Sequence, residues 1–159
     1  MKKRTKVILA SITSVTVVAI CLIWWAASPN DLGLTKSSLA MGGNPDVEAL
    51  RANTKTVADA YLAQRKGDLT QACGGPYQIA VNYTLSSKAR DLGYRSSFYY
   101  FCWDIYLPYS LRTDSGEDFL VLVQLSDRTP GNKHDISNFR VLRAYVIDNA
   151  NQVNAQFNE

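Results

Sequence analysis

An uncharged run of 21 residues, Val7–Ala27, is the feature that most restricts what this chain can fold into. As an α-helix the run would span about 31 Å, close to the hydrocarbon thickness of a bilayer. Trp24 and Trp25 lie near its end, and tryptophan is enriched at membrane–water interfaces. The run therefore predicts a single transmembrane anchor at residues 7–27, with the lipid bilayer as a partner and the two tryptophans at the membrane interface.

The flanks of this run predict its orientation. Four basic residues precede it, whereas the first acidic residue is Asp31. Because cytoplasmic flanks carry the excess of Lys and Arg, we expect residues 1–6 in the cytoplasm and the remainder on the extracytoplasmic side of the cell membrane. A cleaved signal peptide is the alternative. A cut after Ala27 would place the bulky Trp25 where the peptidase needs a small residue, so the uncleaved anchor is favoured.

The chain beyond the run is close to neutral. It has 17 basic and 14 acidic residues in all, and removing the four leading basic residues leaves 13 against 14, a net charge of −1. A nucleic-acid partner is therefore not expected, because such domains need a basic face. Ser, Asn and Gly dominate residues 28–44, which predicts a flexible linker. One folded domain at 45–148 and a polar tail at 149–159 would follow.

Two cysteines, Cys73 and Cys102, fall inside the predicted domain, and Cys21 falls inside the predicted anchor. In an exported domain a cysteine pair is expected to form a disulfide. Closing this loop of about 30 residues would stabilise the fold by about 3–4 kcal/mol in the chain-entropy model. The alternative is a pair of buried free thiols.

The start of the domain predicts an amphipathic helix. Asn44 suits the N-cap and Pro45 the first helical position, and apolar residues then recur at spacings of three and four. Gly67 predicts the helix end, and Asp68 is expected to cap a short second helix towards Cys73. Residues 76–95 are ambiguous, with a short helix expected over 88–92.

From Ser97 the apolar pattern changes to a period of two. Strands are predicted over 98–107, 119–125 and 139–147, with a turn at 113–116 between the first two. A long helix followed by antiparallel strands predicts an α+β domain, with the helix packed on a curved sheet of three to four strands. A fourth strand within 77–85 is left open.

Three short segments carry a resemblance to a known superfamily: Val57-Ala58-Asp59-Ala60-Tyr61-Leu62, Lys66-Gly67-Asp68 and Ala72-Cys73. With the order of elements over 44–147, they resemble exported members of the NTF2-like (cystatin-like) superfamily. The resemblance implies a long first helix over a curved sheet that encloses a pocket.

No residues form a recognisable catalytic or metal-binding constellation. His134 is the single histidine and lies in a polar loop with no second titratable group at catalytic spacing. A metal site would lack a ligand set, because one histidine and a cysteine pair expected to be oxidised do not provide one. No catalytic residue, metal or cofactor is therefore predicted.

The aromatic stretch 98–106 provides the candidate pocket. Alternation places Tyr100, Cys102, Asp104 and Tyr106 on one strand face. If Cys102 turns inward to meet Cys73, then Tyr100, Asp104 and Tyr106 turn inward as well and could line a small-molecule pocket. The alternative is a surface ion pair of Asp104 with Arg140 or Arg143.

Together these features favour a non-enzymatic, membrane-anchored interaction domain. It would serve as an accessory subunit or assembly factor of a larger membrane-protein complex, of the secretion or respiratory type. The alternative is an NTF2-like ligand-binding domain or enzyme that uses the pocket of Tyr100, Asp104 and Tyr106.

Overall fold

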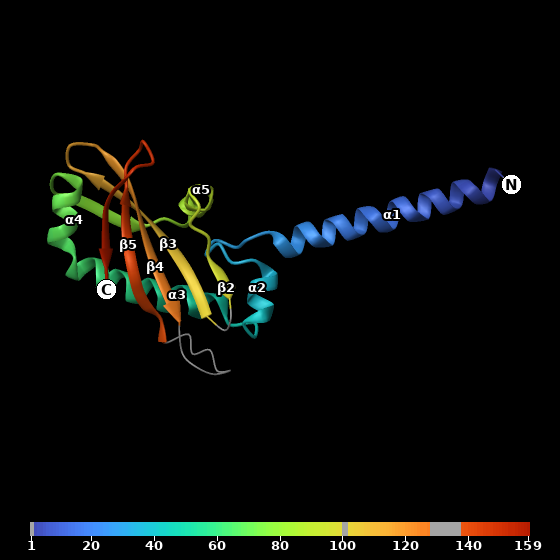
Figure 1. The fold of residues 1–159 in the computed structure, drawn as a ribbon, viewed down its shortest axis with the longest axis horizontal. Coiled ribbons are helices and arrows are strands. Elements are labelled where there is room, and N and C mark those ends of the chain that lie inside the picture. The colour runs from blue at the N-terminus through green and yellow to red at the C-terminus, as the bar shows by residue number, and fades with distance from the viewer. Residues whose placement is uncertain (1, 100–101, 128–137) are drawn as a thin grey trace.

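The computed structural model describes residues 2–99, 102–127 and 138–159, with side chains described for 15–98, 102–127 and 138–159. The protein is α+β. Within the described ranges, one antiparallel sheet of six strands carries a long helix, α3, across one face. The N-terminal helix α1 (Lys2–Ala27) projects away from this domain (Figure 1).

Helix α1 requires a correction to the predicted membrane topology. Among the residues whose side chains are described, no helix is long and apolar enough to cross a membrane. The described apolar stretch of α1 runs from Val15 to Ala27, about 20 Å as a helix against the roughly 30 Å of a hydrocarbon core. Residues 7–14 of the predicted anchor lie outside the described side chains. This finding contradicts the transmembrane anchor at 7–27, and the single-pass, extracytoplasmic placement that depended on it.

The predicted interface tryptophans have a different setting. Trp24 and Trp25 are 76% and 61% exposed, and the large apolar side chains from Val15 to Ile23 are each more than half exposed. The Lys36 ammonium lies 3.3 Å from the centroid of a Trp25 ring. Helix α1 is therefore in contact with the segment that follows it, through a cation–π interaction.

Residues 28–44, predicted as a linker, pack against the domain. Leu32 and Leu34 are fully buried in its core, and the Asn30 side chain accepts hydrogen bonds from the backbone N–H of both, at 3.0 Å. Asp31 forms an ion pair with Arg51 of α3. The short helix α2 (Lys36–Met41) follows, capped by Thr35. The polar composition predicted a flexible linker, but the burial of two leucines is enough to fix this segment on the domain.

Helix α3 (Val47–Gln64) starts two residues later than expected. Asp46 is its N-cap, with Oδ1 accepting a hydrogen bond from the Glu48 N–H at 2.9 Å. Asn44 instead adopts a left-handed backbone, with φ of 52°. The buried residues of α3 recur every four positions: Leu50, Thr54, Ala58 and Leu62. Helix α4 (Lys66–Cys73) follows directly after a turn at Arg65, so Gly67 lies within α4 and does not end α3.

The residues that the structure describes form a sheet of six strands, so the predicted three to four is wrong. Strand order is β1-β3-β4-β5-β6, and β2 also pairs with β3. The long strands are β3 (Cys102–Thr113), β4 (Asp118–Asp127) and β5 (Arg140–Ile147). The additional strands are β1 (Tyr77–Val81), β2 (Ser97–Tyr99) and β6 (Val153–Asn158). Strand β6 occupies the predicted polar tail, because Val153, Ala155 and Phe157 alternate with polar residues.

The two faces of the sheet have separate cores. Trp103, Ile105 and Leu107 of β3 pack on the α3 side. Leu122 and Tyr145 pack on the other side, which the short helices η1 (Tyr83–Leu85) and α5 (Ser86–Asp91) accompany. The α3 side is the larger core, and its margins form the sites described below.

Gly42 is expected to be intolerant of substitution, because a Cβ there would lie 1.9 Å from Cζ2 of Trp103. We expect Gly42→Ala to lower the free energy of unfolding by about 1–3 kcal/mol, as overpacking of a core does. Gly67→Ala is the matched control, since its Cβ would meet nothing within 4 Å and alanine favours a helix. Chemical denaturation of both variants measures the difference, and equal stability of the two would contradict the packing described.

Candidate binding site beside helix α3

The sheet is wider than the single helix that crosses it. Five strands side by side, from β1 to β6, extend about 19 Å between the outer strand axes at a spacing of about 4.8 Å. A helix with its side chains is about 10 Å across. The margins of the sheet are therefore left open on both sides of α3, and each margin forms a hollow.

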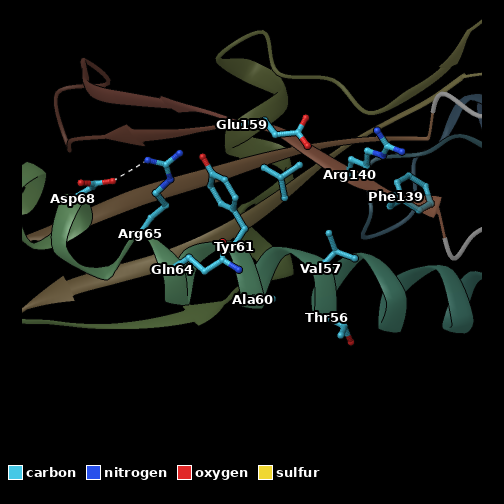
Figure 2. Close-up of a pocket in the computed structure, with 11 residues that line it drawn as sticks. Thr56, Val57, Ala60, Tyr61, Gln64, Arg65, Asp68, Phe139, Arg140 and Glu159 are labelled. Carbon is cyan, nitrogen blue, oxygen red and sulfur yellow. Dashed lines mark hydrogen bonds and ion pairs between the residues drawn. The ribbon is translucent and has the colours of Figure 1, made fainter.

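The hollow on the β5 side of α3 has a volume of about 710 Å³ (Figure 2). Its apolar surface comes from Val57 of α3 together with Phe139 and Val141. Tyr61 rises from α3 into this hollow, and Arg65, which follows the helix, points towards Asp68. The lining residues are Thr56, Val57, Ala60, Tyr61, Gln64, Arg65, Asp68, Phe139, Arg140, Val141 and Glu159.

The polar groups at one end of this hollow are bonded to one another. Arg65 donates to Asp68 at 3.2 Å and to the Asn158 carbonyl at 2.9 Å. The Tyr61 hydroxyl donates to the same carbonyl at 3.3 Å. Burial raises the pKa of Tyr61, while the nearby Arg65 charge opposes the rise. These contacts hold the end of β6 against α3.

The hollow on the β1 side of α3 has a volume of about 530 Å³. Side chains of α3, with Lys66 at the start of α4, form one wall, and the partly exposed inner side chains of β1 form the other. The lining residues are Lys55, Asp59, Leu62, Ala63 and Lys66 on the helical wall, and Tyr77, Ile79, Ala80, Val81 and Tyr109 on the sheet.

A three-residue polar cluster lines this hollow. The hydroxyl of Tyr109 donates to Asp59 Oδ1 at 2.7 Å, and the Lys55 ammonium forms an ion pair with Oδ2. Tyr109 is 2% exposed. Its burial, followed by its hydrogen bond to Asp59, holds the pKa of Tyr109 well above its ordinary value. Both oxygens of the Asp59 carboxylate therefore have donors, and the phenol stays protonated at neutral pH.

Two of the three residues predicted to line a pocket, Asp104 and Tyr106, lie on the opposite face of the sheet. Trp103 and Ile105 take the α3 side, so alternation turns Asp104 and Tyr106 towards α5. The Tyr106 and Tyr94 rings pack with centroids 5.6 Å apart. Burial raises the pKa of Tyr106 to about 12. The small cavity that Tyr106 lines measures about 10 Å³, room for no more than one water. Tyr100 lies outside the described residues.

The predicted ion pair of Asp104 is not found among the described residues. Asp104 lies opposite Ser126, which in turn lies opposite Arg140, yet Asp104 Oδ1 is buried without a hydrogen-bond partner. The Arg143 guanidinium points to the Tyr145 hydroxyl at 3.5 Å.

The predicted disulfide is wrong: Cys21, Cys73 and Cys102 are all free thiols. Cys73 is four residues from Tyr77, which pairs with Thr113 at the end of β3, whereas Cys102 begins that strand. A strand of 12 residues spans about 36 Å, and four residues of chain bridge at most about 14 Å. With about 5 Å between the paired Cα atoms of Tyr77 and Thr113, the two cysteines are at least roughly 17 Å apart, far beyond disulfide reach.

Metal-binding groups of three or more His, Cys, Asp or Glu side chains are absent from the part of the chain that the structure describes. His134 lies outside that part. Comparison with protein-family models, with curated proteins and with solved structures finds no match to this chain. The NTF2-like resemblance therefore stays a prediction.

The β1-side hollow was missed at the level of sequence. None of the helical residues that line it was predicted to form a site, and β1 fell within the ambiguous segment 76–95. Two signals were present: the spacing of Lys55 and Asp59, which makes them neighbours on a helix, and the alternation of Tyr77, Ile79 and Val81. Only the fold shows that these two patterns face each other.

The free thiols give a direct check. Burial, with a smaller contribution from Glu117, raises the pKa of Cys73 to about 11, and thiolate is the reactive form. We expect Cys73 to resist alkylation in the native protein at pH 7.5, and all three cysteines to react in denaturant without reductant. Mass spectrometry after labelling measures both. One labelled thiol in denaturant would instead indicate a disulfide.

The Tyr109 hydroxyl is expected to stabilise the fold. Tyr109→Phe should lower the free energy of unfolding by about 1 kcal/mol at pH 7, since it removes a donor from Asp59. The raised pKa means that the Tyr109 contribution is present below about pH 10 and is lost as the pH rises further, because the unfolded phenol ionises first. Wild-type stability should therefore fall more steeply above pH 10 than that of the variant.

The matched control is Tyr61→Phe, which removes a longer and more exposed hydrogen bond at 3.3 Å and should cost less at pH 7. Urea unfolding of the three proteins between pH 7 and pH 11 measures these differences. Equal pH dependence of wild type and Tyr109→Phe would contradict the burial of an un-ionised phenol.

Proposed function

We propose that this protein is a non-enzymatic interaction domain that binds a protein partner beside α3 and works as a subunit of a larger assembly. The observation that carries the proposal is the pair of open hollows on either side of α3, of about 710 and 530 Å³. Each combines an apolar surface with charged groups at its margin. Such surfaces are typical of contacts with other proteins.

The state of the ionisable groups supports binding over catalysis. Asp59 is held by Tyr109 and Lys55, and Arg65 is held by Asp68 and the end of β6. A general base or acid needs a pKa near the working pH and access to the substrate. The phenol of Tyr109 lacks such a pKa, because burial raises it, and it lacks access to a substrate, because the side chain is buried.

Helix α1 supports the idea of a larger assembly. Its large apolar side chains between Val15 and Trp25 are more than half exposed, and exposed apolar surface of this extent is characteristic of proteins that work in contact with others. An NTF2-like arrangement is part of the proposal, and the position of α3 across one face of an antiparallel sheet supports it.

A photo-crosslinking experiment tests the proposal. A benzophenone amino acid is placed at Val57 in the β5-side hollow, at Ala63 in the β1-side hollow, and at the exposed Ala52 of α3, which lines neither hollow. We expect one protein to be crosslinked from a hollow position and not from Ala52. That protein is then purified and its affinity for the full chain is measured.

Arginine variants provide the matched comparison. Ala60→Arg fills the β5-side hollow, Ala63→Arg fills the β1-side hollow, and Ala52→Arg adds the same charge elsewhere on α3. One hollow variant should weaken binding of the purified partner at least 10-fold, and Ala52→Arg less than twofold. Equal affinities for all three variants, or equal crosslinking from all three positions, would refute binding beside α3.

A further inference from the structure

Strand β1 is an open edge of the sheet that the described residues form. It pairs with β3 on one side and is the last strand in the order. Natural edge strands are usually guarded by charges, proline or a bulge. Strand β1 reads Tyr-Gln-Ile-Ala-Val, which contains none of these side chains, and its register with β3 is continuous over all five residues. The edge is therefore suited to pairing with another strand.

The hydrogen-bond pattern shows which residues of β1 face that edge. The Asn82 N–H donates to the Pro108 carbonyl, and the Asp114 N–H donates to the Pro76 carbonyl. Hydrogen-bonded pairs alternate along an antiparallel ladder, so Gln78 and Ala80 also direct their main-chain groups to β3. The N–H and C=O groups of Tyr77, Ile79 and Val81 therefore point away from β3, to the open side.

The same three residues border the β1-side hollow. Their side chains pack towards the α3 core and line the hollow opposite the stripe of α3. A residue hydrogen-bonded to Ile79 from an added strand would direct its side chain to the same face of the sheet. Every second side chain of such a strand would thus enter the hollow beside Asp59, Ala63 and Lys66.

Resting on the function proposed above, we propose that the β1-side hollow binds an extended segment of the partner protein as an added strand on β1. The segment has apolar side chains at alternate positions, which fill the apolar part of the hollow. It carries a carboxylate at the end near Tyr77. There Lys66 lines the hollow, and its ammonium has no acidic side chain within ion-pair distance among the described residues.

The opposite edge of the sheet is less suited to this role. No residue of β6 (Val153–Asn158) lines the β5-side hollow; only Glu159, which follows the strand, reaches it. The carbonyl of Asn158 already accepts hydrogen bonds from Tyr61 and Arg65. A partner strand that inserts its side chains into a hollow therefore fits β1, because the residues of β1 both form the sheet edge and line a hollow.

A peptide selection tests the inference without knowledge of the partner. A phage library of random 12-residue peptides is selected on the full chain, after removal of phage that bind the Ala63→Arg variant, whose added side chain fills the hollow. This counter-selection discards peptides that bind α1 or other surfaces. We expect enriched sequences with apolar residues at alternate positions and an acidic residue at one end.

The enriched peptide is then synthesised in two N-methylated forms. One form is methylated at two odd-numbered residues of the peptide and the other at two even-numbered residues. An added strand uses the N–H groups of one phase and leaves those of the other phase free. One form should lose affinity at least 10-fold and the other less than threefold. Ala63→Arg should abolish binding of the unmodified peptide, Ala52→Arg should leave it within twofold, and Lys66→Gln should weaken it about 5-fold.

Equal losses for the two methylated forms, or no enrichment over the counter-selected protein, would overturn strand addition on β1. The outcome is separable from that of the proposed function. If the purified partner loses affinity with Ala60→Arg and not with Ala63→Arg, binding beside α3 stands while the present inference fails. If no variant affects the partner, the proposed function fails.

Discussion

The alternation of side chains along β3 is the constraint on which the rest of the structure depends. This strand pairs with β1 and β2 along one side and with β4 along the other. Its odd-numbered residues from Trp103 to Leu111 are buried under α3, and its even-numbered residues face α5. A shift of one residue would exchange the two faces completely. Pro108 is tolerated in β3 because its ring nitrogen points to the side on which β1 pairs, and β1 ends at Val81, opposite Tyr109. The missing N–H therefore removes no hydrogen bond to strand β1.

Local patterns in the sequence predicted some elements of this architecture and missed others. The period of α3 was readable because the helix buries one continuous face, and the three long strands were readable because their central residues are mostly apolar and buried. Strand β1 is short, and its pairing partners lie about 30 residues away, outside any local window. Strand β6 pairs with the nearby β5, but its three apolar residues alternate within a segment that is otherwise polar. The burial of Leu32 and Leu34 is likewise a tertiary effect, so a polar segment was predicted as a linker.

The candidate site was harder to predict for the same reason. The disulfide was inferred from the number of cysteines, whereas the register of β1 and β3 decides the distance between Cys73 and Cys102. The inward orientation predicted for Asp104 depended on this disulfide and is wrong for the same reason. The β1-side hollow combines a stripe of α3 with a strand that begins 13 residues after α3 ends, and neither part indicates a site when read alone.

The packed segment between α1 and α3 also has a mechanical consequence. The Lys36–Trp25 contact joins α2 to the end of α1, the two buried leucines fix the following turn in the core, and Gly42 rests on the ring of Trp103. A force applied to α1 would therefore be transmitted to the sheet through packed and hydrogen-bonded residues. The segment between α1 and α3 thus restricts how α1 can move relative to the hollows beside α3.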